Sequence, residues 1–181
     1  MKIFKTNIEG ALVLEPMCFK DTRGNFMESW NQKEFSKIIG KQISFVQDNH
    51  SFSYKNVLRG LHYQRKFPQG KLVRVCSGKV LDIAVDLRKS SSTFGCYDSV
   101  ILSNKNKKQF WIPEGCAHGF LTLSESADFL YKTTNFYYPN DEATIKYNDT
   151  DLNINWGIHE NDVIISDKDN AGIAFKDAHL F

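Results

Sequence analysis

Short apolar runs, separated by turn residues at short intervals, occupy most of this 181-residue chain and restrict its fold more than any other feature. Spacing of this kind is typical of strands in an antiparallel sandwich or barrel. Two facing sheets can bury a core that lone strands cannot. We find no linker, repeat or low-complexity tract, so we predict one domain over residues 1–181. The expected fold class is all-β, an antiparallel jelly roll with a few short helices.

The clearest predicted strand covers residues 80–87, where Leu81, Ile83 and Val85 alternate with Asp82 and Ala84. Other predicted strands cover residues 11–14, 26–30, 43–48, 57–63, 71–76, 97–102, 109–112, 118–123 and 127–133.

One helix is predicted after Asn31, which can cap it, with Glu34 at the third helical position. Phe35, Ile38 and Ile39 give this helix an apolar face, and Gly40 ends it. The tail after residue 148 carries only short, weak signals.

Composition excludes several classes of protein. The formal net charge of +2 argues against nucleic-acid binding through a general basic surface, but it leaves room for a local basic pocket that binds one phosphorylated ligand. The N-terminus has no continuous apolar segment, so we expect no signal peptide, and no run approaches the ~20 apolar residues of a membrane span. The cysteines are far apart, which predicts free buried thiols and a cytoplasmic protein: Cys18, Cys76, Cys96 and Cys116.

The segment Leu58–Gln64 carries the strongest functional signal, because Arg59, Gly60 and His62 interrupt a predicted strand. An imidazole can exchange a proton near neutral pH, and a guanidinium can hold negative charge. On an ideal strand the two side chains would face opposite sides. A bulge at Gly60 would bring both into one pocket. The alternative is a hydrogen-bonded core histidine beside a surface arginine.

Residues 113–120 contain Pro-x-Gly-x-x-His, ending at His118, which resembles the second half of the metal-binding signature of cupins. The first half has His-x-His, and the corresponding segment here is His62-Tyr63-Gln64. Two histidines and a glutamine make a poor ligand set for a catalytic metal. We therefore expect the cupin-like fold without a metal.

Other polar residues lie in or beside predicted apolar strands: Gln47, Asn49, Lys71 and Tyr131. Each alone is more often structural than catalytic. Because buried polar groups are costly unless paired or used, their accumulation favours a site. The segment 166–169 adds acids, one of which could orient His62, although spacing alone does not say which.

These motifs resemble the dTDP-4-dehydrorhamnose 3,5-epimerase family over nearly the whole chain. The resemblance rests on the ordered segments Phe19–Glu28, Gln47–Ser51, Leu58–Gln64, Gly70–Val75, Asp82–Arg88, Ile112–Phe120, Tyr131–Thr134, Tyr138–Glu142 and Ser166–Asp169. It implies a metal-free, cupin-type jelly-roll homodimer without a cofactor. The implied reaction converts dTDP-4-dehydro-6-deoxy-D-glucose to dTDP-4-dehydro-L-rhamnose, by proton transfer at C3 and C5 beside the C4 ketone.

The resemblance also implies residue roles. His62 is expected as the base, Asp169 as its partner and Tyr131 as the proton donor from the opposite face of the sugar. Arg59 and Lys71 are expected near the C4 carbonyl. Other positions match substrate-binding residues of the family: Arg23, Glu28, Gln47, Asn49, His118, Glu142 and Lys168.

The family's dimer exchanges an N-terminal strand, so Arg23 and Glu28 are expected to act on the partner's ligand, and Tyr138 is expected to stack on the nucleotide. The chain departs from the family at Cys116, where Phe is more common, and at Trp156-Gly157, which replaces Trp-Pro. Fine substrate preference is therefore open. The alternatives are a C3-only or C5-only epimerase on a related nucleotide sugar, a non-catalytic sugar-binding module, or a metalloenzyme.

Overall fold

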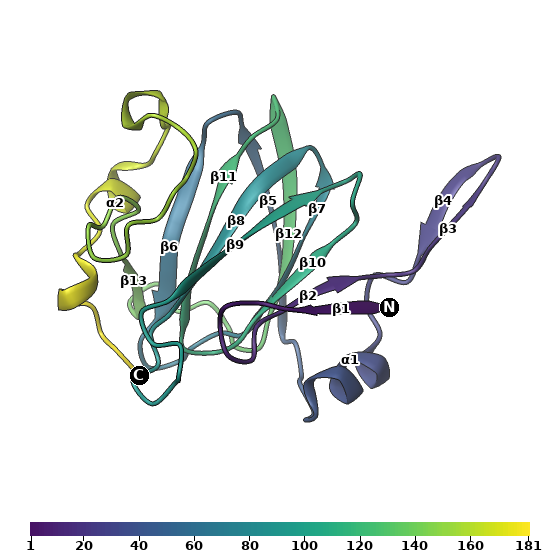
Figure 1. Ribbon diagram of the computed structural model, residues 1–181, viewed down its shortest axis with the longest axis horizontal. Helices are drawn as coiled ribbons and strands as arrows, with labels where there is room; N and C mark the ends of the chain where they lie inside the picture. Colours follow the sequence, from purple (N-terminus) through teal and green to yellow (C-terminus); the bar gives the residue numbers. More distant parts are fainter.

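Two antiparallel sheets face each other in a computed structural model that describes all of residues 1–181 (Figure 1). The six-stranded sheet has the order β1-β2-β10-β7-β12-β5, and the five-stranded sheet has the order β13-β6-β11-β8-β9. The strands of the first are β1 (Lys2–Lys5), β2 (Leu12–Glu15), β10 (Gln109–Ile112), β7 (Lys71–Ser77), β12 (Ser126–Thr133) and β5 (Gln47–Tyr54). Those of the second are β13 (Glu142–Thr144), β6 (Leu58–Gln64), β11 (Cys116–Thr122), β8 (Lys79–Asp86) and β9 (Tyr97–Ser103). The predicted antiparallel jelly roll is confirmed.

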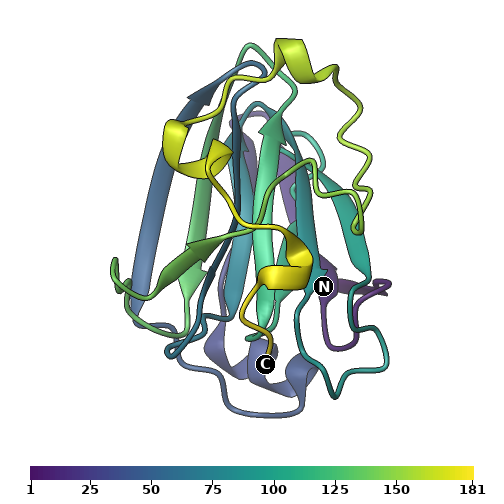
Figure 2. The same ribbon diagram turned by 90° about the vertical axis from the view of Figure 1, so that its left-hand side faces the viewer.

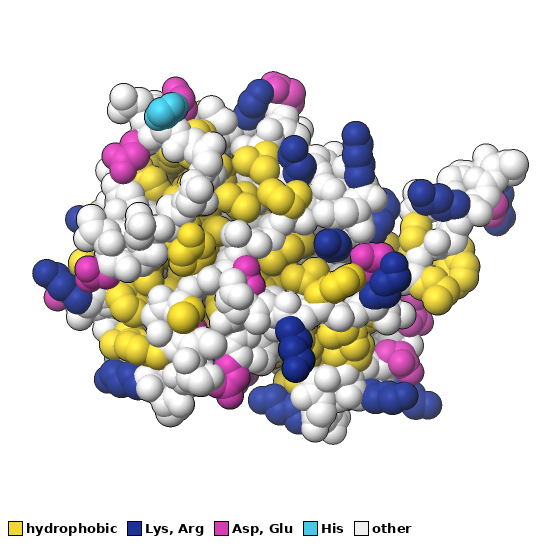
Figure 3. Space-filling model, viewed as in Figure 1, with side chains coloured by type: hydrophobic (Ala, Val, Ile, Leu, Met, Phe, Trp, Pro, Cys, Tyr) yellow, Lys and Arg dark blue, Asp and Glu magenta, His cyan; other side chains and the backbone are white.

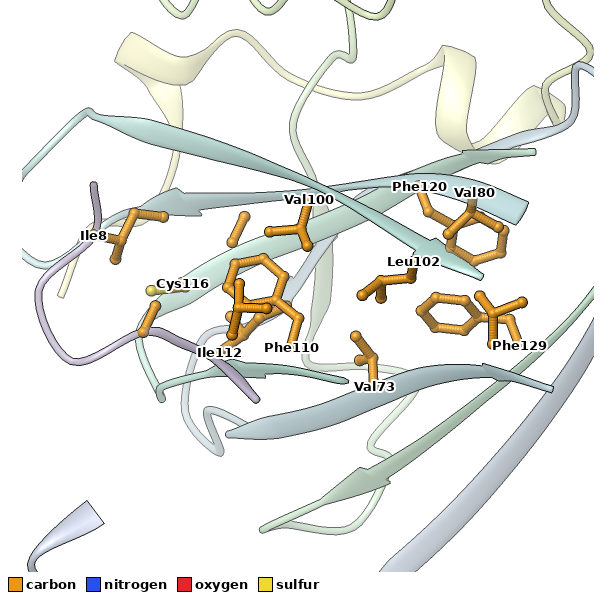
Figure 4. Packing of buried hydrophobic residues seen from close by; sticks show 14 of the residues in the cluster. Ile8, Val73, Val80, Val100, Leu102, Phe110, Ile112, Cys116, Phe120 and Phe129 are labelled. Atoms are coloured by element: carbon orange, nitrogen blue, oxygen red, sulfur yellow. The ribbon is translucent and has the colours of Figure 1, made fainter. Parts of the chain in front are cut away.

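The main core lies between the two sheets and contains 15 buried residues. Phe110 and Val73 come from the six-stranded sheet, and they meet Leu102 and Val100 of the five-stranded sheet (Figure 4). Phe129 stacks on a ring of the opposite sheet, with 4.3 Å between its centroid and that of Phe120. Burying side chains of this size contributes roughly 1.5–3 kcal/mol each to folding, so this core holds the sheets together at one end of the sandwich.

The C-terminal tail covers the outer face of the five-stranded sheet (Figure 2). Ile83, Val85 and Leu87 lie on that face, whereas Asp82 and Ala84 point into the sandwich. The tail includes the short helices η1 (Glu160–Asp162), α2 (Asp167–Asn170) and η2 (Phe175–Asp177). Both faces of β8 are therefore buried, which the sequence did not indicate because the tail's signals are weak.

Helix α1 (Gln32–Ile39) forms as predicted. The side chain of Asn31 accepts a hydrogen bond from the backbone N–H of Glu34, and Gly40 ends the helix with a φ of 78°. Phe35 is buried and its ring meets that of Trp111 edge-on at 5.2 Å. The helix thereby packs on the outward face of the six-stranded sheet, against Leu14 and Leu72.

A two-stranded arm, β3 (Cys18–Asp21) and β4 (Gly24–Met27), projects away from the sandwich (Figure 1). Apolar side chains stay uncovered on it, and Phe26 and Phe19 are 71% and 58% exposed. Figure 3 shows such apolar atoms on the arm next to basic ones. Exposed apolar area of this kind marks an interaction surface.

Several sequence predictions need correction. The strand predicted at residues 43–48 is wrong, because Ile43 and Phe45 pack under α1 and the strand β5 begins at Gln47. The strand predicted at residues 26–30 overlaps only the end of β4. Strands β1, β3 and β13 and helix α2 were not predicted.

All four cysteines are free, as predicted, but only Cys116 is buried, and Cys76 and Cys96 are exposed. Burial raises the pKa of the Cys116 thiol to about 12. The longest helix has eight residues, and no helix has the length and hydropathy that a membrane span needs.

Candidate active site

A cavity of about 310 Å³ lies between the two sheets, beside the apolar core, whose residues Phe120 and Phe129 line part of it. It is lined mainly by polar side chains. Eight of the predicted site residues line it: Gln47, Asn49, Arg59, His62, Lys71, His118, Tyr131 and Glu142. Two further predicted residues, Asp169 and Lys168, bind cavity residues directly. The structure thus brings together residues that are up to 122 positions apart in the chain (169 − 47).

The predicted bulge at Gly60 is present. On β11, His118 pairs with His62 and Phe120 pairs with Arg59, so one residue of β11 faces two of β6. Gly60 has a φ of 121°, which L side chains rarely adopt. A Cβ atom at this position would lie 2.6 Å from Cα of Gly119. The bulge lets Arg59 and His62 line one cavity, against their opposite parity on a regular strand.

His62 and Asp169 form a hydrogen-bonded pair, with 2.7 Å between Nε2 and a carboxylate oxygen. The other carboxylate oxygen accepts from the backbone N–H of Gly60 at 3.1 Å. Burial raises the pKa of Asp169, but the bonds from His62 and Gly60 outweigh it, so that the pKa lies below its usual value. The carboxylate therefore stays ionised, fixes the imidazole and leaves Nδ1 free to take a proton.

Asp169 is held in place by the start of α2. Ser166 caps this helix, and its hydroxyl accepts a hydrogen bond from the backbone N–H of Asp169 at 3.2 Å. The weakly patterned tail thus supplies the acid that the sequence left unassigned among residues 166–169.

Lys71 approaches the cavity from β7 on the opposite sheet, and only 7% of the residue is exposed. Burial lowers the pKa of its amine to about 8, partly offset by the charges of Glu142 and Asp82. No side chain or backbone group hydrogen-bonds the amine. It remains mostly protonated at pH 7 and can act on an oxygen in the cavity that gains negative charge.

Tyr131 also lies on the six-stranded sheet, on β12 next to β7. It lines the cavity with no hydrogen-bond partner for its hydroxyl, and burial raises its pKa. The phenol therefore stays protonated at neutral pH. Since His62 lies on the five-stranded sheet, the two proton-transfer candidates reach the cavity from opposite sides.

His118 lies deeper and bonds to Asp82 of β8. Its Nε2 is 3.1 Å from each carboxylate oxygen. The side chain of Asp82 has 0% exposure, and burial raises its pKa and lowers that of His118. Sequence analysis did not single out Asp82. Its position within an apolar strand was the available signal.

Glu142, Lys168 and Tyr137 form a charged group at the cavity rim. The carboxylate of Glu142 accepts from the Tyr137 hydroxyl at 2.9 Å and from the Lys168 amine. Burial raises the pKa of Glu142, but the bonds and the charges of Lys168 and His62 bring it below its usual value. Tyr137 is a further lining residue that the sequence analysis did not identify.

Arg59, on β6, is anchored by β5 of the opposite sheet. Its Nε donates to the Ser53 hydroxyl at 2.9 Å, and one terminal nitrogen donates to the carbonyl of Phe52. These bonds aim the guanidinium along β5.

The inward face of β5 is polar rather than apolar. Gln47 donates to Asn49 at 2.8 Å, and both begin β5 instead of ending an earlier strand. Ser51, next on that face, has a buried hydroxyl with no partner.

Tyr138 does not line the cavity but lies beside its rim, where its ring packs against Phe67 with 4.4 Å between centroids. Arg23 and Glu28 are not at this cavity. Arg23 sits at the exposed tip of the arm, in an ion pair with Asp21, and Glu28 is exposed just beyond β4.

Gln64, at the position where the cupin signature has a second histidine, is fully occupied by the backbone. Its amide nitrogen donates to the carbonyls of Phe67 and Phe136, and its oxygen accepts from the N–H of Tyr138. No group of three or more His, Cys, Asp or Glu is arranged to hold a metal ion. The role of Gln64 here is to support the cavity rim.

The model of the dTDP-4-dehydrorhamnose 3,5-epimerase family matches residues 5–177 of the chain. The chain belongs to this family. It is 53% identical over 182 residues to the dTDP-4-dehydrorhamnose 3,5-epimerase of Shigella flexneri, covering 100% of this chain and 99% of the relative.

Two solved structures extend the comparison. A 3,5-epimerase from Legionella pneumophila, in complex with dTDP-4-keto-L-rhamnose, superposes with a TM-score of 0.93 at 48% identity, covering 97% of this chain and 93% of that one. A 3′-monoepimerase from Streptomyces bikiniensis, in complex with dTDP-quinovose, has a TM-score of 0.86 at 30% identity and covers 93% and 85% of the two chains. The fold alone therefore does not fix how many carbons are inverted.

Proposed function

We propose that this protein epimerises dTDP-4-dehydro-6-deoxy-D-glucose at C3 and C5 to give dTDP-4-dehydro-L-rhamnose. One observation carries the proposal: His62, hydrogen-bonded to the ionised carboxylate of Asp169, and the protonated Tyr131 reach one cavity from opposite sheets. Inversion at a carbon beside a ketone needs a base on one face and a proton donor on the other.

In the proposed step, His62 takes the proton from the carbon beside the C4 ketone. The electron pair of that C–H bond moves into an enolate whose negative charge lies on the C4 oxygen. Tyr131 then returns a proton to the carbon from the opposite face. His62 and Tyr131 restore their protonation states by exchange with solvent.

The enolate oxygen needs fixed positive charge as it forms. Lys71 meets this need in the proposal, because its amine is a buried cation without a protein partner. Arg59 adds a second cation to the cavity from the five-stranded sheet, opposite Lys71. No cofactor or metal is required, because the ketone of the substrate itself stabilises the carbanion.

The remaining cavity residues are proposed to bind the rest of the substrate. Lys168 is a cation that suits a diphosphate. Tyr138, already packed on Phe67, offers an aromatic face to the base. Polar contacts to the sugar and nucleotide are assigned to the other predicted residues: Gln47, Asn49, His118 and Glu142.

We further propose that one jelly-roll domain of this chain pairs with a second copy in the cytoplasm. The exposed apolar arm supports a homodimer, because Phe19 and Phe26 are uncovered in the single chain. In this arrangement Arg23 and Glu28 reach the partner's cavity, since neither lies at the cavity of its own chain.

Proton NMR of the substrate in D₂O tests this function. A 3,5-epimerase incorporates deuterium at both C3 and C5 and forms the L-rhamno product. Incorporation at one carbon only would instead identify a monoepimerase, and binding of the sugar nucleotide without any exchange would identify a sugar-binding module.

A further inference from the structure

Lys71 borders a second space besides the cavity. Lys71 and Gln69 line both the cavity and a narrow adjoining gap, which we call the Lys71 gap. The gap has no room for a water molecule. Six further residues complete its lining: Tyr63, Gln64, Pro68, Gly115, Cys116 and Phe181. None of these six lines the cavity itself, so they meet Lys71 from the side that does not face the proposed substrate.

The Lys71 gap approaches the surface of the protein at only a few residues. Pro68, Gln69 and Phe181 are partly exposed, whereas every other lining residue is buried. Pro68 and Gln69 belong to the loop before β7, and the side chain of Gln69 is tied to the carbonyl of Asn135 at 2.9 Å. Phe181 is the one lining residue that comes from the C-terminal tail. Its ring therefore stands between the gap and solvent on the side of the tail.

Phe181 is held in this position by its backbone and by its ring. Its N–H donates to the carbonyl of Leu87 at 3.0 Å, and its carbonyl accepts from the N–H of Lys89 at 2.7 Å. The ring meets that of Tyr63 edge-on at 6.2 Å. A Cβ atom at Gly115 would lie 3.6 Å from the ring, so the ring covers this glycine in ordinary van der Waals contact. The tail thus brings one aromatic ring to one end of the sandwich, where the C-terminus is marked (Figures 1 and 2).

The state of Lys71 depends on how well water is kept from it. Titratable groups face the amine from three neighbouring strands: Asp82 of β8, Cys116 and His118 of β11, and Glu142 of β13. The negative charges of Asp82 and Glu142 raise the pKa of Lys71, yet burial outweighs them and lowers it to about 8. Because water stabilises the charged form of an amine, water that entered the Lys71 gap would reverse this shift.

We infer that Phe181 is a positioning residue of the epimerase, whose ring closes the Lys71 gap and keeps solvent from the amine of Lys71 on the side of the tail. The inference rests on the proposed function, in which this amine stabilises the enolate oxygen. A cation acts more strongly on a developing negative charge in a site without water than in water. The tail then serves the site twice, since Asp169 orients the base and Phe181 keeps the cation dry.

Competitive labelling of lysine amines with acetic anhydride, read by mass spectrometry over a range of pH, measures the pKa of Lys71 without substrate. In Phe181→Ala water can enter the gap, so this pKa should rise by about one unit or more, toward the ordinary value of about 10.4. The fall of kcat/KM at alkaline pH should move with it. At pH 7 kcat should drop about tenfold, with KM within about threefold of wild type.

Two further variants separate closure of the gap from a general loosening of the tail. Phe181→Leu keeps an apolar side chain over the gap and should hold the pKa of Lys71 near its wild-type value. Phe175→Ala is the matched control, because Phe175 lies on the same tail and covers Gly95 at 3.6 Å, as Phe181 covers Gly115. Phe175 lines neither the gap nor the cavity, so its loss should leave Lys71 unchanged.

An unchanged pKa of Lys71 in Phe181→Ala would overturn the inference, as would an equal shift in Phe175→Ala or an ordinary pKa in the wild-type protein. A different result would count against the proposed function instead. If the pKa of Lys71 rises in Phe181→Ala but the alkaline fall of kcat/KM stays where it is in wild type, Phe181 closes the gap as inferred, and Lys71 does not stabilise the enolate.

Discussion

Nε2 of His62 and a carboxylate oxygen of Asp169 lie 2.7 Å apart, although the two residues are separated by 107 positions in the chain. The bulge at Gly60 and the start of α2 together make this contact. The same carboxylate binds the backbone N–H of Gly60, so the acid fixes both the base and the strand that carries it. The proposed chemistry and the local backbone conformation are therefore coupled.

Tyr131→Phe should separate proton exchange from inversion. Without the phenol hydroxyl, the base can remove a proton and return one to the same face, but the opposite face has no donor. We expect deuterium in the unchanged D-gluco substrate and at least a 100-fold loss of L-rhamno product, the order of a lost general acid. NMR of the recovered sugar measures both.

Tyr54→Phe is the matched control for this substitution, because Tyr54 lies on the outward face of β5 and is 67% exposed. Full inversion by Tyr131→Phe would assign the donor role to another group.

The lowered pKa of Lys71 predicts that activity falls at alkaline pH. The pKa of its amine is about 8, so the charge is present below that pH and is lost above it. If this charge stabilises the enolate, kcat/KM falls about tenfold per pH unit above the pKa. In Lys71→Met this alkaline decline of kcat/KM should vanish, and activity should be low at every pH. If the decline persists in Lys71→Met, it is caused by the titration of another group.

The same substitution should stabilise the fold. The pKa of Lys71 is lower in the folded than in the unfolded protein, so folding is penalised below pH 8 and the penalty fades as pH rises to the unfolded value. Lys71→Met removes a penalty of about 3 kcal/mol at pH 7. Urea unfolding measures the difference. Lys132→Met, which removes a lysine paired with Asp48 on the surface, is the control and should change stability by less than about 1 kcal/mol.

Gly60→Ala should damage both fold and site. The added Cβ would meet backbone atoms of Gly119 and His118 at 2.6 and 2.7 Å, at a φ of 121°. We expect a loss of about 3 kcal/mol or more in the free energy of unfolding. Gly157→Ala is the control. Gly157 also has a positive φ, 69°, but a Cβ atom added there would meet no atom within 4 Å. This substitution should lower the free energy of unfolding by only about 1 kcal/mol. Equal losses in the two variants would exclude close packing as the cause.

Mixing two inactive variants tests whether the arm acts in trans. Glu28→Gln carries an altered arm and an intact cavity, and His62→Asn carries the reverse. If each cavity uses the partner's arm, a mixed dimer contains one intact site, and random mixing restores roughly a quarter of wild-type activity. If the activity of the mixture stays at the level of the separate variants after subunit exchange, the arm acts on the cavity of its own chain.

Hydrophobic pattern predicted the elements whose apolar faces meet the core. Strand β10 has the predicted bounds, and α1 has the predicted caps. The pattern failed at β5, because the inward face of this strand lines a polar cavity and carries Gln47 and Asn49 in place of apolar residues. The apolar residues just before it, Ile43 and Phe45, were mistaken for the strand although they pack under α1.

The site was predicted best where a residue conflicts with its surroundings. Gly60 within a strand indicated the bulge, and Lys71 and Tyr131 stood out within apolar runs. Asp82 was missed because its bond to His118 depends on the register between β8 and β11, which no local pattern contains. The position of Arg23 and Glu28 depends on a second chain, so one sequence cannot fix their contacts.

The central claim is that His62, held by Asp169, starts an inversion beside the C4 ketone. The most direct measurement follows deuterium incorporation and product formation by NMR in D₂O, with wild-type protein and His62→Asn. The account predicts exchange at C3 and C5 with L-rhamno product for wild type, and for the variant no product and no exchange at one carbon or more. Product formed by His62→Asn at the wild-type rate, or a wild-type protein that exchanges neither carbon, would contradict it.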